Sequence, residues 1–126
     1  MPYTITYNEA GYIVLAGAGD AKLKDLKEAI VFGLPLVKEH NCYRILSDFR
    51  QLKLNLSMID IFTIPSIQSV LSRELNMPFY HFRRAVLVPD HDYDKYKFFE
   101  NVAVNRSHVV RVFIDEERAL GWLLQK

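Results

Sequence analysis

Charged side chains gather where three predicted strands of this sequence end. They are Asp48, Arg50, Asp90, His91 and Asp115. Ligands of α/β proteins tend to bind outside the carboxyl ends of parallel strands, where helix N-termini also present unpaired N–H groups. The pattern therefore predicts a site for a small polar or anionic ligand, held by those N–H groups and by Arg50. Helix capping is the alternative, because aspartate is favoured at the N-cap and complements the helix dipole there.

No catalytic set or metal site stands out beside these residues. The serines lack the Gly-x-Ser-x-Gly setting of a hydrolase nucleophile, and the four histidines are dispersed. The acidic run at residues 90–94 lacks the glycine and the distal glutamate of a calcium loop. Cys42 is the only cysteine, which excludes an internal disulfide and a cysteine-based metal site. We therefore expect no cofactor and no metal, and an enzyme that uses Asp48 and His91 is the alternative.

The spacing of apolar residues predicts the elements that position these side chains. Period-two patterns predict strands over residues 3–7, 12–16, 43–49, 84–88 and 108–114. A long helical pattern follows the second strand, with Asp20 as its N-cap and with a kink caused by Pro35. Two short helical pieces, a third helix and a final helix capped by Asp115 complete the pattern, over residues 58–63, 65–73, about 96–103 and from 116.

The order of these elements predicts the topology of the sheet. Adjacent strands joined by a short turn pair antiparallel, whereas strands separated by helices need crossovers and pair in parallel. The sequence therefore predicts a single α/β domain over residues 1–126, with a five-strand mixed, mostly parallel sheet (ββαβαβαβα) and flanking helices. Gly17 and Gly19 are expected to end the second strand, and residues 51–56 are expected to form a loop.

The charge and composition are those of an ordinary globular protein. Sixteen Lys and Arg stand against fifteen Asp and Glu, and the net charge of +1 gives no reason to expect a nucleic acid or an anionic membrane as partner. No apolar run approaches the ~18 residues of a membrane span. The first residues lack the basic and apolar regions of a signal peptide. We therefore expect a cytoplasmic protein.

The order of elements, together with three segments, resembles the SpoIIAA-like STAS domains, named for sulphate transporters and anti-sigma-factor antagonists. The segments are Ile45-Leu46-Ser47-Asp48, Ala85-Val86-Leu87-Val88-Pro89 and the ending from Val112 to Leu123. That ending contains Asp-Glu-Glu-Arg-Ala-Leu-Gly-Trp-Leu and is similar to the ending of one bacterial branch of the family. The resemblance implies a regulatory or protein-binding module more often than an enzyme.

One feature of that family is missing here. Regulatory STAS domains place an Asp-Ser-Ser/Thr-Gly segment just after the third strand, and a Ser or Thr in it is phosphorylated. In this chain Phe49 and Arg50 follow Asp48, and no Ser-Gly pair appears. Ser57 reaches a comparable place, the N-terminus of the second helix, and is the phosphorylation candidate. A plain helix cap is the alternative role for Ser57.

The second helical region carries more apolar residues than one helix face needs. Ile61, Ile64 and Ile67 recur every three residues across Pro65. If the break at Pro65 turns this stripe outward, the stripe predicts a homodimer about a two-fold axis. A core beneath a broken helix and the wall of a lipid pocket are the alternatives.

Overall fold

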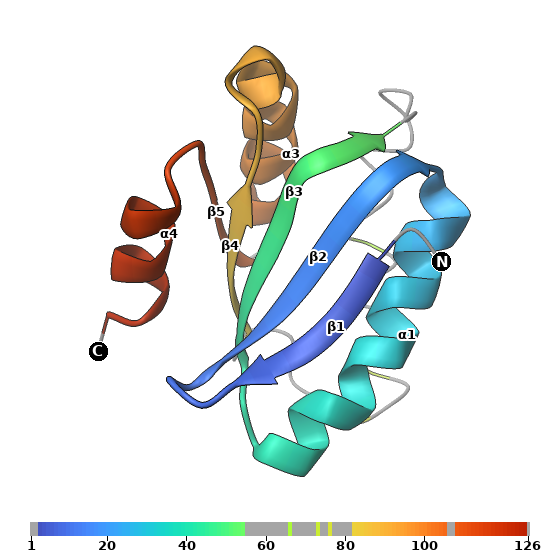
Figure 1. The fold of residues 1–126 in the computed structure, drawn as a ribbon, viewed down its shortest axis with the longest axis vertical. Coiled ribbons are helices and arrows are strands. Elements are labelled where there is room, and N and C mark those ends of the chain that lie inside the picture. The colour runs from blue at the N-terminus through green and yellow to red at the C-terminus, as the bar shows by residue number, and fades with distance from the viewer. Residues whose placement is uncertain are drawn as a thin grey trace.

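The structure is a computed structural model that describes residues 3–54, 66, 73, 76, 82–105 and 108–125. The strands are β1 (Tyr3–Asn8), β2 (Tyr12–Ala21), β3 (Arg44–Leu54), β4 (Arg83–Leu87) and β5 (Val109–Phe113). The helices are α1 (Leu23–His40), α3 (Tyr93–Asn105) and α4 (Glu116–Leu123), and a 3₁₀ turn (Asp90–Asp92) precedes α3. Figure 1 shows their arrangement. No described helix is both long and apolar enough to cross a lipid bilayer.

The five strands form one sheet in the order β1-β2-β3-β4-β5. β1 is antiparallel to β2, and every other neighbouring pair is parallel. The short turn between β1 and β2 forces the antiparallel pair, and the helical crossovers produce the parallel ones. The predicted five-strand, mostly parallel α/β sheet is therefore confirmed.

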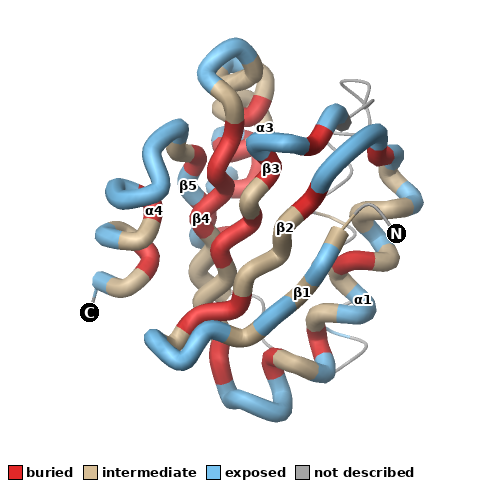
Figure 2. Tube along the Cα trace, in the orientation of Figure 1, coloured by how far each residue is buried: buried red, intermediate tan, exposed pale blue. Residues whose placement is uncertain are grey.

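Helices cover both faces of the sheet. Apolar residues of α1 pack on Ile13 and Ile45, and those of α3 pack on Val86 and Val112 of the same face. α4 packs on the opposite face through Ala119 and Leu123. In Figure 2 the buried residues run along the middle of the sheet, whereas β1 alternates between half-buried and exposed residues.

The edge strand β5 is protected by α3. The buried carboxylate of Glu100 accepts a hydrogen bond from the backbone N–H of Val112 at 2.8 Å, and it also pairs with Lys97. This contact satisfies a backbone donor that an edge strand otherwise leaves unpaired.

The first helix begins later than the sequence predicts. β2 continues to Ala21, so Asp20 lies in the strand and Lys22 occupies the N-cap of α1. The side chain of Asp25 accepts a hydrogen bond from the backbone N–H of Lys22 at 2.8 Å and stabilises this end. The prediction of an Asp20 cap is therefore wrong. Pro35 lies inside α1, which continues through it to His40.

The central strands β2 and β3 are also longer than predicted. Residues 18–21 of β2 pair with residues 51–54 of β3 after a register shift between Ala16 and Ala18. The predicted loop at residues 51–56 is therefore strand as far as Leu54. Gly17 lies inside β2, where a Cβ would come within 3.1 Å of the Leu52 side chain, so the glycine leaves room for that side chain.

Several predictions lie outside the described residues. They concern Ser57, the stripe of Ile61, Ile64 and Ile67, and the helical pieces over residues 58–63 and 65–73, of which the structure describes residues 66 and 73 alone.

Candidate functional site

The structure joins two of the predicted site residues at the carboxyl end of the sheet. Arg50 makes a two-pronged contact with Asp48, from Nε to Oδ1 at 3.0 Å and from Nη2 to Oδ2 at 2.9 Å. The hydrogen bonds and charge of Arg50 lower the pKa of the Asp48 carboxyl, although burial opposes this effect. The same pair raises the pKa of Arg50. Both side chains remain partly accessible, at 41% for Arg50 and 25% for Asp48.

A third charged residue, which the sequence analysis missed, belongs with this pair. The Oε2 atom of Glu116 lies 3.9 Å from Nη2 of Arg50. Asp48 is on the sheet face that α4 covers, and Glu116 is the first residue of α4. We call Asp48, Arg50 and Glu116 the carboxyl-end cluster. Its signal in the sequence is an acidic first helical turn directly after β5.

Asp115 is a helix cap. Its Oδ1 atom accepts a hydrogen bond from the backbone N–H of Glu117 at 3.0 Å, and Asp115 is the N-cap of α4. Arg118 lies 3.8 Å from its Oδ2 atom. The predicted capping role of Asp115 is confirmed.

Asp90 and His91 lie in the 3₁₀ turn that follows β4. Pro89 occupies the N-cap position of this turn and Asp90 is its first residue, so the alternative role of helix cap does not apply to Asp90. The His91 side chain is 79% exposed, and its Nε2 atom lies 3.6 Å from Oδ2 of Asp92. The enzyme alternative needs Asp48 and His91 in one closed pocket, and the described ion pairs place them with different partners.

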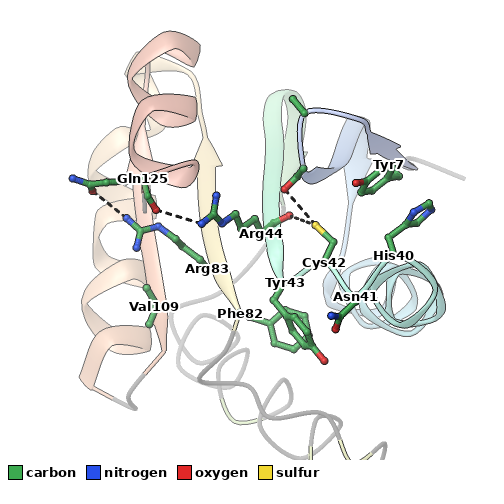
Figure 3. A pocket seen from close by; sticks show the side chains of 12 residues that line it. Tyr7, His40, Asn41, Cys42, Tyr43, Arg44, Phe82, Arg83, Val109 and Gln125 are labelled. Atoms are coloured by element: carbon green, nitrogen blue, oxygen red, sulfur yellow. Dashed lines mark hydrogen bonds between the residues drawn. The ribbon is translucent and has the colours of Figure 1, made fainter.

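A groove lies at the opposite, amino end of the sheet, and sequence reasoning did not find it. It has a volume of about 610 Å³ and is open to solvent. Its lining comes from the end of β1 and the β1–β2 turn, the end of α1, the starts of β3, β4 and β5, and Gln125 beyond α4 (Figure 3). We call it the amino-end groove. Its residues are Tyr7, Ala10, Gly11, His40, Asn41, Cys42, Tyr43, Arg44, Phe82, Arg83, Val109 and Gln125.

Metal-ligating residues do not cluster in the part of the chain that the structure describes. No three His, Cys, Asp or Glu side chains there lie close enough to hold an ion. Cys42, which lines the amino-end groove, instead points its Sγ atom at the backbone carbonyls of Gly11 and Arg44, at 3.5 and 3.6 Å.

Comparison with known proteins identifies relatives of the fold. No family model and no curated protein sequence matches this chain. An anti-sigma factor antagonist from Mycobacterium paratuberculosis matches 98% of this chain and 93% of its own, with a TM-score of 0.59 and 10% identity. SpoIIAA in its unphosphorylated form, itself an anti-sigma factor antagonist, matches 95% and 96%, with a TM-score of 0.50 and 14% identity.

A further solved structure is an uncharacterized protein of the DUF3478 family from Shewanella loihica PV-4, described as having a SpoIIAA-like fold. It matches 96% of this chain and 91% of its own, with a TM-score of 0.51 and 17% identity. At these identities the likeness concerns the fold. The resemblance to SpoIIAA-like domains is confirmed at that level.

Proposed function

Because this chain has a SpoIIAA-like fold, we propose that it is a non-enzymatic bacterial regulatory module that acts by binding a protein partner. The observation that carries the proposal is the match of 95–98% of the chain to two structures named as anti-sigma factor antagonists. A fold alone does not specify a function, so the proposal also needs a surface on this chain.

The surface that we propose for the partner is the carboxyl-end cluster. An exposed ion pair such as Arg50 with Asp48 adds little to folding stability, because water and salt screen it. Charges of both signs at a protein surface instead select partners, since a mismatched charge opposes binding. The cluster also borders the extended ends of β2 and β3, which offer a rigid platform for it.

The extension of β3 also argues for a switch different from the one in regulatory STAS domains. In those domains a helix with the phosphorylated residue opens just after the third strand, whereas here β3 continues past Asp48 to Leu54. A phosphorylated residue directly after Asp48 would therefore lie in a strand. Ser57 remains the predicted phosphorylation candidate, with helix capping as its alternative role.

Affinity capture from the source cell tests the proposal, with the full chain as bait. Replacing Arg50 with Glu puts three carboxylates together in the carboxyl-end cluster. We expect this bait to recover the partner at least about tenfold less well than the wild type, because like charges at an interface cost several kcal/mol. Lys27→Glu is the matched control, since Lys27 is exposed on α1, away from the cluster. Equal recovery by the Arg50 variant and the control contradicts the proposed surface, and the absence of any protein enriched by the wild-type bait contradicts the proposed function.

Self-association is a second, separate proposal that rests on the stripe of Ile61, Ile64 and Ile67. Light scattering of the wild type at high concentration is expected to show a dimer, and Ile64→Asp is expected to give a folded monomer. A wild-type chain that is already monomeric contradicts the dimer and assigns these isoleucines to the core.

A further inference from the structure

Two arginines lie side by side in the amino-end groove. Arg44 and Arg83 are register partners on β3 and β4, so their side chains leave the same face of the sheet. Both line the groove, and Figure 3 shows both directed toward Gln125 at the end of the chain after α4. Two positive charges are therefore held within one site by rigid strands.

The hydrogen-bond partners of both arginines are neutral. Arg83 donates from Nε and Nη2 to the backbone carbonyl of Trp122, at 3.0 and 2.7 Å, and from Nη2 to Oε1 of Gln125 at 3.3 Å. Arg44 donates from Nη2 to the backbone carbonyl of Gln125 at 3.5 Å. A guanidinium has five N–H donors, so both arginines keep donors for another acceptor. Among the described residues neither arginine has a carboxylate within 4.0 Å.

The ends of the two neighbouring helices neutralise only part of the positive charge of Arg44 and Arg83. The contacts with Trp122 and Gln125 place the arginines at the carbonyl end of α4, where cations are favoured. A helix C-terminus carries about half a negative charge, and the C-terminus of α1 beside the groove adds a similar amount. These two ends together offset about one of the two positive charges. None of the lining residues that the structure describes is an aspartate or a glutamate.

Aromatic rings form other walls of the groove. Tyr7 and His40 are stacked, with ring centroids 3.8 Å apart and an angle of 1° between the planes. Phe82 meets Tyr43 edge to face at 5.2 Å. The volume of about 610 Å³ is in the range of sites for small molecules. The groove thus combines free cationic donors with flat apolar surfaces.

We propose that the amino-end groove binds a small molecule in which an oxyanion, a phosphate or a carboxylate, is joined to an aromatic ring. Arg44 and Arg83 receive the oxyanion through charge-assisted hydrogen bonds, which are the stronger kind. The ring lies against the aromatic walls formed by Tyr7, His40 and Phe82. This site is independent of the proposed protein contact, because it lies at the opposite end of the sheet from the carboxyl-end cluster.

Phenyl phosphate is the probe for this proposal, titrated into the full chain and followed by amide NMR shifts. We expect saturable shifts at residues of the groove. Inorganic phosphate, which lacks the ring, and phenol, which lacks the phosphate, are expected to bind more weakly. Arg44→Gln is expected to weaken phenyl phosphate binding at least about tenfold, which corresponds to ~1.4 kcal/mol. Arg118→Gln is the matched control, because Arg118 is exposed in the first turns of α4, and it is expected to bind like the wild type.

A second variant separates binding from folding. His40 is exposed, so His40→Ala removes one ring of the stack without disturbing the core. We expect it to weaken the binding of phenyl phosphate but not that of inorganic phosphate. The absence of saturable shifts in the wild type overturns the proposal. An equal loss of binding in the Arg44 and Arg118 variants, or no change in either, also overturns it.

Discussion

At the carboxyl end of the sheet Arg50 faces two carboxylates, whereas at the amino end the described partners of Arg44 and Arg83 are neutral oxygen atoms. A near-zero net charge describes neither end. The carboxyl-end cluster carries one positive and two negative charges, whereas the amino-end groove keeps positive charge that its described surroundings do not neutralise. The net charge of a chain therefore says little about its partners unless the positions of the individual charges are also known.

The largest effect that we expect comes from Arg83. Replacing Arg83 with Met removes its two hydrogen bonds to the carbonyl of Trp122 and the stacking of its guanidinium at 4.2 Å from the centre of the Trp122 ring. The free energy of unfolding is expected to fall by about 2 kcal/mol, because a partly buried carbonyl loses its charged donor. Urea unfolding measures this loss. A change as small as that of Arg118→Met, expected within ~0.5 kcal/mol, would show that Arg83 does not hold α4 in place.

The next effect is smaller and depends on pH. The pKa of Asp48 is lowered in the folded protein, so the pair with Arg50 stabilises the fold fully above the unfolded pKa of about 3.9. This contribution is lost as the pH falls through the lowered pKa of Asp48. Asp48→Asn is expected to cost less than about 1 kcal/mol at pH 7, because the pair is partly exposed. Unfolding at a series of pH values is expected to show the variant and the wild type converging in acid. If the difference in unfolding free energy between the variant and the wild type does not change with pH, the stabilising pair of Asp48 with Arg50 is contradicted.

Glu116 is expected to have the smallest effect. Its carboxylate lies 3.9 Å from Arg50 and is 54% exposed, so its main contribution is to the N-terminal end of the α4 dipole. Glu116→Gln is expected to lower the unfolding free energy by about 0.3–0.5 kcal/mol, with most of the loss removed by high salt. Thermal melts at low and high salt measure it. If Glu116→Gln lowers the unfolding free energy as much as Arg83→Met does, the charges that stabilise the fold lie at the carboxyl end of the sheet instead of the amino end.

The fold was predictable because apolar periodicity and connection length determine strand pairing. The predicted strand ends were wrong where two local signals were misread. Gly17 and Gly19 predict the end of the second strand, but both lie inside β2, and Gly17 makes room for the Leu52 side chain of the neighbouring strand. The alternation of Gln51, Leu52 and Lys53 is itself a strand pattern, and these residues lie in β3 instead of the expected loop.

The two sites differ in how much of them the sequence could predict. Asp48 and Arg50 are neighbours along one strand, so their pairing follows from spacing alone. The amino-end groove is assembled from a turn, a helix end, three strand starts and the end of the chain. Arg44 and Arg83 are far apart in the sequence, and only the register of β3 with β4 brings them together.

The most direct test of the central claim is hydrogen exchange of the full chain with and without the captured partner. We expect slower exchange in the partner complex at Asp48–Leu54 and in the first turn of α4, with unchanged exchange at the starts of β3 and β4. Protection confined to the amino-end groove, or no protection in any part of the chain, would contradict the claim that the carboxyl-end cluster is the surface for a protein partner.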